Sequence, residues 1–162
     1  MRHISILCVG KLKERFYTDA AAEYAKRLRR FCQLEITELP EERLPDRPSP
    51  AQIDAALAKE GATIRERITK SNGTGNGEIK LIALCVEGQT ISSEQFARRI
   101  EDENRVIFLI GGSFGLHESV KALADWKLSL SPMTFPHHLA RVMLLEQIYR
   151  AYQISAGGQY HK

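Results

Sequence analysis

The sequence predicts an α/β protein with a parallel sheet and helices on both of its faces. Short apolar segments typical of strands alternate along the chain with longer segments of helical periodicity. An apolar strand at residues 105–110 also leads directly into a turn with three glycines, Gly111, Gly112 and Gly115. A length of 162 residues and an apolar content of 43% fit one domain, residues 1–162, with a sizeable core.

The amino-terminal half predicts a strand, a helix and a second strand, followed by a surface connection. Residues 2–9 and 34–39 have strand composition, and residues 16–31 between them carry helical apolar spacing. Four prolines then interrupt regular structure: Pro40, Pro45, Pro48 and Pro50. Ser49 can cap a helix over residues 50–70, with proline at its first position.

The carboxyl-terminal half continues the alternation after a glycine-rich segment at residues 71–77. That segment lacks the Gly-Lys-Ser/Thr ending of a phosphate loop and precedes a strand, so we expect a flexible turn. The elements predicted after it are strands at 79–86, 105–110 and 126–131, and helices from the capping box of Ser92 to about 102, at 117–124 and from 136 to about 156.

Ligands of parallel sheets bind where the strands end, and three loops of this chain are expected there. These are the loops that contain Gly88, Gly111 and residues 131–134. The glycine turn has neither the spacing nor the position of a dinucleotide fingerprint, and no lysine follows it as in an NTPase. A ligand held by backbone groups of several loops, such as S-adenosylmethionine, remains possible on this pattern, and so does a purely structural turn.

Charge and cysteine usage set further expectations. The net charge is +3, and seven cations are concentrated near the amino terminus: Lys11, Lys13, Arg15, Lys26, Arg27, Arg29 and Arg30. This cluster permits an anionic partner such as RNA, but it is also typical of a solvated helix face. Cys8, Cys32 and Cys85 lie in apolar surroundings without metal-ligand spacing, which predicts buried free thiols and no metal. Without an export signal or a membrane span, we expect a cytoplasmic protein.

The final helix is apolar nearly all round, which predicts burial on two sides. It is expected to be either the central helix of the monomer or the contact between two copies of the chain.

The motifs of the carboxyl-terminal third closely resemble one family. They are Ile110-Gly111-Gly112-Ser113-Phe114-Gly115-Leu116, Leu130-Ser131-Pro132-Met133-Thr134-Phe135-Pro136-His137, Arg141, Glu146-Gln147-Ile148-Tyr149-Arg150-Ala151 and Tyr160-His161-Lys162. Together with Val9-Gly10-Lys11-Leu12-Lys13, they resemble the SPOUT-class ribosomal RNA large-subunit methyltransferase H family. That family N3-methylates a pseudouridine in the helix-69 loop of 23S rRNA.

The resemblance implies a trefoil knot in the carboxyl-terminal part, a homodimer through the last helix, and S-adenosyl-L-methionine as cofactor. It assigns the cofactor to Leu84, Gly111, Leu130, Ser131, Pro132, Met133, Thr134 and Phe135. A Gly111→Val substitution is therefore expected to obstruct the cofactor. The chain departs from the family in a longer turn at residues 72–77, and in Gln159, which stands where a proline often precedes the terminal Tyr-His.

Four residues are the candidates for catalysis: His137, Arg141, Tyr160 and His161. Attack by N3 of pseudouridine requires loss of its imide proton or stabilisation of the resulting anion. His161 is a candidate base, Lys162 or Arg150 could hold an anion, and Tyr160 offers a stacking face for an unpaired base. His137 could instead cap the final helix. A dimer could place this tail in the partner's pocket. Two rival functions remain, an RNA-binding module of the same fold without catalysis and a nucleotide-binding oxidoreductase.

Overall fold

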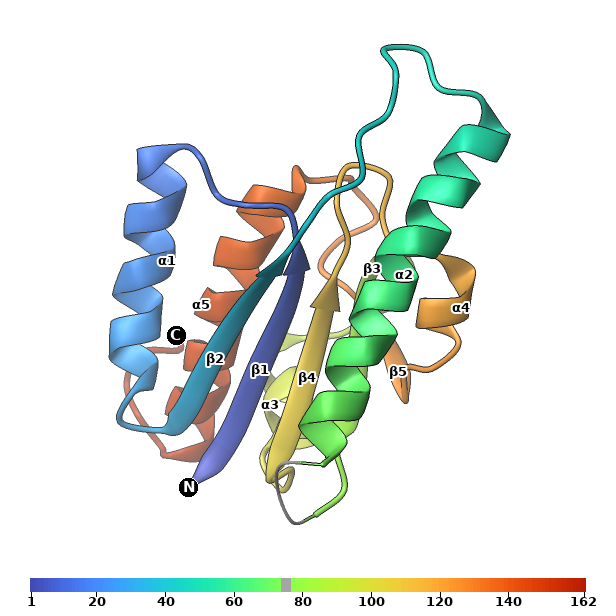
Figure 1. Cartoon of the computed structure of the whole chain (residues 1–162). Coiled ribbons are helices and arrows are strands. Elements are labelled where there is room, and N and C mark those ends of the chain that lie inside the picture. The colour runs from blue at the N-terminus through green and yellow to red at the C-terminus, as the bar shows by residue number, and fades with distance from the viewer. Residues whose placement is uncertain (74–76) are drawn as a thin grey trace.

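The computed structural model describes residues 1–73 and 77–162, so the centre of the predicted glycine-rich turn lies outside the described residues. Strands and helices alternate along the chain (Figure 1), which confirms the predicted α/β class. The strands are β1 (Arg2–Val9), β2 (Cys32–Leu39), β3 (Lys80–Thr90), β4 (Arg105–Ile110) and β5 (Trp126–Ser129). The helices are α1 (Arg15–Leu28), α2 (Pro50–Asn72), α3 (Ser93–Ile100), α4 (Glu118–Lys121) and α5 (His137–Ser155).

The five strands form one sheet in the order β2-β1-β4-β3-β5, and every pairing in it is parallel. Arg2 pairs with Cys32, so β2 begins two residues before the predicted start at residue 34. Strands β1, β2 and β4 end at the top of Figure 1, whereas β3 continues past Leu84 through an arch to Thr90. The arch of β3 that begins after Leu84 therefore lies beside the loops that follow β4 and β5.

Helices cover both faces of the sheet, as predicted. Side chains of β4 alternate, so that Phe108 packs in a core with Leu145 of α5, while Leu109 packs in a second core with Ile64 of α2. Helix α5 contacts both α1 and α3 on the first face, and α2 contacts α4 on the other (Figure 1). Helix α5 is therefore a central helix of the monomer, which was one of its two predicted roles.

Two predicted serine caps are present. Ser49 accepts a hydrogen bond from the Gln52 backbone N–H at 3.2 Å, and Ser92 accepts one from Gln95 at 3.2 Å. Both close a full capping box, in which the glutamine side chain returns a bond to the serine backbone. The starts of α2 and α3 are thus fixed by local sequence. The end of α1 differs from its prediction, because this helix ends at Leu28, three residues before the predicted end.

Strand β3 differs most from its prediction, because it runs four residues further and pairs with β5 twice. Leu84 and Gln89 both pair with Leu128, so the residues between them arch away from the sheet. Gly88 closes this arch, since a Cβ there would lie 2.7 Å from the Leu128 carbonyl carbon. The prediction that Gly88 opens onto the ligand edge is therefore wrong, and residues 84–87 take that position.

Within the part of the chain that the structure describes, no helix is long and apolar enough to span a bilayer. Cys8 and Cys32 are buried free thiols as predicted, whereas Cys85 is only half-buried.

Candidate functional site

A cavity of about 710 Å³ lies at the edge where the strands end. Five segments line it, namely residues 84–87 of β3, the loops that follow β4 and β5, Lys121 of α4 and the start of α5. Its volume is in the range of small-molecule sites, and its lining mixes apolar side chains, backbone and few charges. Two of the three predicted loops, those with Gly111 and residues 131–134, therefore meet at one pocket, and residues 84–87 stand in place of the loop with Gly88.

Seven of the eight residues that the resemblance assigns to a cofactor line this cavity. They are Leu84, Gly111, Leu130, Ser131, Met133, Thr134 and Phe135. Pro132 is not among the lining residues in the described part of the chain. In the same segment, the Ser131 hydroxyl accepts a hydrogen bond from the Met133 backbone N–H at 3.0 Å, so this loop has a defined local shape.

The glycine turn closes on itself. The Gly115 N–H donates to the Gly112 carbonyl oxygen at 3.0 Å, and Gly115 has a φ of +80°. A Cβ on Gly111 would lie 2.3 Å from the Gly115 carbonyl carbon, which is too close for any side chain. Gly111 therefore allows two backbone segments of the turn to approach each other.

Glu41 fixes the same turn from the loop that follows β2. Its Oε1 accepts hydrogen bonds from the Ser113 backbone N–H and from the Ser113 hydroxyl, both at 3.0 Å. Glu42, the next residue, donates its backbone N–H to Glu60 of α2 at 2.9 Å. The sequence reasoning missed Glu41, and its position two residues beyond the end of β2 was the available signal.

A charged pair also lines the cavity and was not predicted. The Lys121 ammonium contacts Glu87, and it lies 3.2 Å from Glu118 within α4. Hydrogen bonding to Lys121 lowers the pKa of the Glu87 carboxyl. Cys85 lines the cavity as well, and burial followed by the Glu87 charge raises the pKa of its thiol. Cys85 is therefore a neutral thiol at pH 7 and not an activated nucleophile.

His137 lines the cavity, whereas Arg141, one turn further along α5, does not. Burial, followed by the charges of His138 and Arg141, lowers the pKa of His137, so its ring is neutral at pH 7. Among the described residues its buried Nε2 has no hydrogen-bond partner, and no side chain caps this end of α5. The interpretation of His137 as a helix cap is therefore wrong.

The Arg141 side chain is 2% exposed and binds inward. It donates to Glu38 Oε1 and to the Gly10 carbonyl oxygen, each at 3.1 Å. Arg141 thus ties α5 to the ends of β1 and β2, and it is not among the described residues that line the cavity.

Tyr160 and His161 are docked at a different place, on Glu146 and Arg150 of α5. The Tyr160 hydroxyl donates to Glu146 Oε1 at 3.1 Å, and Arg150 lies 4.8 Å from the Tyr160 ring centre. His161 contacts Arg150 at 3.1 Å and Glu94 of α3 at 2.8 Å. The hydrogen bond between His161 and Glu94 is the main cause that lowers the pKa of the Glu94 carboxyl to about 2.

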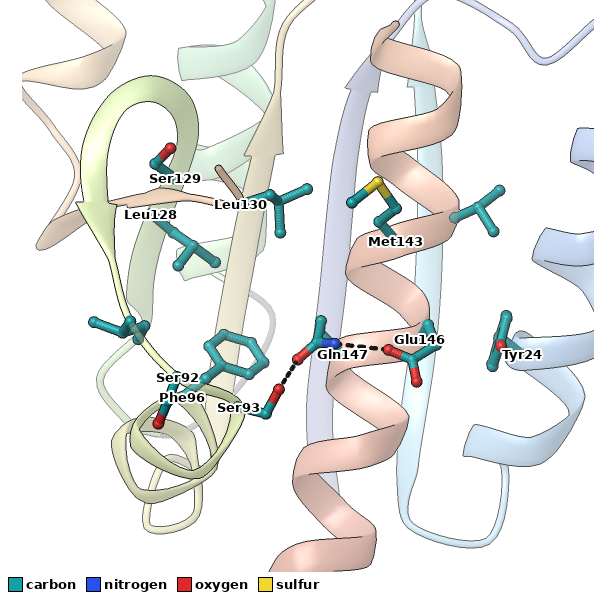
Figure 2. Close-up of a pocket in the computed structure, with 12 residues that line it drawn as sticks. Tyr24, Ser92, Ser93, Phe96, Leu128, Ser129, Leu130, Met143, Glu146 and Gln147 are labelled. Carbon is teal, nitrogen blue, oxygen red and sulfur yellow. Dashed lines mark hydrogen bonds between the residues drawn. The ribbon is translucent and has the colours of Figure 1, made fainter. Parts of the chain in front are cut away.

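A second cavity of about 420 Å³ lies beside this tail, between α3, α5 and α1 (Figure 2). Gln147 crosses it, accepting a hydrogen bond from Ser93 at 2.7 Å and donating one to Glu146 at 2.8 Å. Leu130 lines both cavities. The two are therefore neighbouring hollows on the two sides of the segment that joins β5 to α5.

The candidate catalytic residues are thus not brought together within one chain. His137 and Arg150 are separated by 13 positions of one helix, which corresponds to roughly 20 Å along its axis. Because His161 is bound beside Arg150, it lies far from the cavity that His137 lines.

Within residues 1–73 and 77–162, no group of three or more His, Cys, Asp or Glu side chains is arranged to hold a metal ion.

Comparisons with known proteins match nearly the whole chain. Residues 2–161 match the family model described as predicted SPOUT methyltransferase. The chain is 44% identical to the ribosomal RNA large subunit methyltransferase H of Bifidobacterium adolescentis, over 98% of this chain and 99% of that protein. It is 45% identical to ribosomal RNA large subunit methyltransferase H 1 of Clostridium perfringens, over 99% of both chains.

A solved structure shares the fold. A probable methylase family protein from Haemophilus influenzae superimposes with a TM-score of 0.57 at 11% identity, over 98% of this chain and 70% of that one. At such low identity the likeness supports the fold alone. The matches to the family model and to relatives above 40% identity establish the family. The chain belongs to the SPOUT methyltransferase family.

Proposed function

We propose that this protein is an S-adenosyl-L-methionine-dependent methyltransferase that methylates N3 of a pseudouridine in the helix-69 loop of 23S rRNA, in the cytoplasm. One observation carries the proposal: seven of the eight residues implied for the cofactor line one cavity where the strands end. The relatives named as ribosomal RNA large subunit methyltransferase H support rRNA as the substrate.

The cavity fits the proposed cofactor in size and in lining. About 710 Å³ is adequate for a nucleoside with a short side chain, and apolar side chains from three loops can enclose its flat face. When bound, S-adenosyl-L-methionine supplies an electrophilic methyl group. Leu84, Leu130, Met133 and the backbone of Gly111 would hold the nucleoside by backbone and apolar contacts.

The protein's own task is to position the acceptor base and to accept the imide proton of N3. His137 presents a neutral ring at the cavity and is one candidate for proton transfer. His161 is the other, with Tyr160 as a stacking face for the acceptor base. Arg141 acts by positioning, because its guanidinium is engaged by Glu38 and Gly10.

A homodimer through α5 would bring the tail to a cavity. Within one chain His161 lies roughly 20 Å along α5 from His137, so the tail serves its own pocket only after a large movement. The second cavity is lined by half-buried apolar residues of α5, Val142 and Met143, which a second copy could cover. We infer that Tyr160 and His161 complete the pocket of the partner.

We infer that the carboxyl-terminal part of the chain forms a trefoil knot. It is supported by the double pairing of β3 with β5, in which Leu84 and Gln89 share the partner Leu128. Figure 2 draws Leu128 and Ser129 beside the resulting arch. The tight approach of Gly88 to the β5 backbone agrees with a segment held close to this arch.

The decisive experiment uses methyl-labelled S-adenosyl-L-methionine and ribosomes that lack the modification. We expect label on one nucleotide of the helix-69 loop, and mapping of the labelled nucleotide tests it. The alternative function is an RNA-binding module of the same fold without catalysis. Calorimetry with S-adenosyl-L-methionine separates the two, since the absence of binding by the folded protein would favour the module.

Mixing two inactive variants tests the shared site. One lacks residues 160–162, and the other carries Thr134→Trp, which fills the cavity from an exposed loop position. If the tail acts in the partner's pocket, a mixed dimer has one working site, and a 1:1 mixture regains about a quarter of wild-type turnover. A mixture that stays inactive, although mixed dimers are detected by mass spectrometry, would rule out action in the partner.

A further inference from the structure

Exposed apolar side chains are concentrated at the mouth of the first cavity. Among the described residues, six large hydrophobic side chains are exposed, and three of these line this cavity: Val86 at 47%, Phe114 at 49% and Met133 at 70%. They come from three different segments, the arch within β3 and the loops that follow β4 and β5. Since clustered exposed apolar groups commonly mark a contact surface, this rim is the candidate contact surface at the cavity.

The Phe114 ring is presented by a turn that is already fixed. Phe114 lies between Gly112 and Gly115, which are joined by a backbone hydrogen bond of 3.0 Å. On its other side, Ser113 is held through both its N–H and its hydroxyl by Glu41. The described part of the chain places no aromatic ring or cation against Phe114. A flat partner can therefore bind this ring without first reorganising the loop.

Positive charge lies next to the same rim. Gly10 approaches Glu41 and His137 closely, with Cβ distances of 3.2 and 3.5 Å for a side chain placed there. Lys11 and Lys13 follow directly and are both exposed. By contrast, Lys121 inside the cavity is already engaged by Glu87 and Glu118. Lys11 and Lys13 thus lie outside the cavity, next to Gly10, where a polyanionic backbone could pass.

We propose that Phe114 is a stacking platform for an unpaired nucleobase next to the nucleotide that is methylated, with Val86 flanking that base. Single-stranded RNA is recognised by such a combination of aromatic faces and adjacent cations. Phe114 is then a specificity-determining contact for the RNA and not for the methyl donor. This inference rests on the proposed function, because it takes RNA as the acceptor.

Three substitutions test the ring itself: Phe114→Ala, Phe114→Leu and Phe114→Trp. Loss of one stacked base weakens binding by about 5- to 100-fold, so Phe114→Ala is expected to raise the KM for unmodified ribosomes by that factor. Phe114→Leu keeps an apolar side chain without a flat face and should resemble the alanine variant. Phe114→Trp should remain near wild type. Leu123→Ala is the matched control, because Leu123 is 46% exposed and lies outside the cavity lining.

Two readouts besides turnover separate RNA contact from donor contact. Calorimetry with S-adenosylhomocysteine should give the same affinity for wild type and Phe114→Ala. A helix-69 hairpin with 2-aminopurine in its loop should show fluorescence quenching with wild type, from stacking, and not with Phe114→Ala.

The outcomes of these experiments distinguish the stacking role of Phe114 from the proposed methyltransferase function on which it rests. Wild-type Kd and KM values in Phe114→Leu, or a loss of S-adenosylhomocysteine affinity in Phe114→Ala with RNA binding intact, would overturn the stacking role alone. Failure of the wild-type protein to methylate ribosomes would instead overturn the proposed function.

Discussion

Replacing Arg141 by leucine tests whether this residue serves structure or chemistry. The guanidinium is 2% exposed and donates two hydrogen bonds, to Glu38 and to the Gly10 carbonyl, each at 3.1 Å. Hydrogen bonds of charged groups contribute about 1.5–3 kcal/mol each, but the Glu38 side chain is 34% exposed and regains water when its partner is lost. We therefore expect Arg141→Leu to lower the free energy of unfolding by about 2–4 kcal/mol.

Urea unfolding followed by circular dichroism measures this loss. With an m value of about 2 kcal/mol per M, the midpoint should fall by roughly 1–2 M. Arg98→Leu, at an exposed arginine of α3, is the control and should change stability by less than about 0.5 kcal/mol. A midpoint shift below about 0.3 M, accompanied by loss of turnover with intact donor binding, would refute the structural assignment and return Arg141 to the catalytic set.

Three further predictions follow from contacts at the same edge of the sheet. Glu41→Ala removes the acceptor that fixes the glycine turn, so S-adenosylhomocysteine should bind about 3- to 10-fold more weakly by calorimetry, and amide exchange across residues 111–115 should accelerate. The pKa of His137 is lower in the folded protein than its ordinary value of 6.5. At pH values near and below 6.5 the unfolded chain therefore binds more protons than the folded protein. As a result, the free energy of unfolding falls as the pH drops through 6.5 toward the folded pKa. His137→Gln should make the loss of unfolding midpoint between pH 7.5 and 5.5 smaller than in wild type, and equal losses in both proteins would contradict the assignment. Gly88→Ala places a Cβ 2.7 Å from the β5 backbone and should lower the melting temperature by about 3–10 °C, whereas Gly73→Ala, with 3.6 Å to its nearest neighbour, should leave it nearly unchanged.

Local sequence was sufficient for the order and the starting points of the elements. Ser49 and Ser92 fix their helices through hydrogen bonds within four residues, which is why both starts were predictable. The ends of β3 depend instead on β5, since Gln89 and Thr90 are strand residues only because Leu128 and Ser129 lie opposite them. A pairing across some forty residues leaves no periodic signal in either segment, and for this reason β3 was predicted four residues too short.

The location of the candidate site could be predicted from the sequence, but the contacts of its side chains could not. Parallel strands place their carboxyl ends at one edge, so the convergence of the loops after β4 and β5 followed from the strand assignments alone, whereas the arch within β3 did not. The partners of Arg141 and His161 did not, because Glu38 and Glu94 are distant in sequence and reach them only through packing of α5 on the sheet and on α3. The resemblance and its positive charge suggested catalysis for Arg141, whereas its burial and its two acceptors show a link between α5 and the ends of β1 and β2.

A substitution at Gly111 cannot test contact with the cofactor directly, because it would first disturb the glycine turn. We expected a side chain at Gly111 to obstruct the cofactor, but its Cβ would meet the Gly115 carbonyl at 2.3 Å before it met any ligand. Gly111→Val would therefore distort the turn, and a loss of donor affinity in that variant would not report direct contact. A side chain that already lines the cavity gives the cleaner measurement. Thr134 is exposed on its loop, so Thr134→Trp can occupy the cavity while the turn, Glu41 and the sheet edge keep their contacts. If folded Thr134→Trp binds S-adenosylhomocysteine as tightly as wild type, the donor site lies outside this cavity.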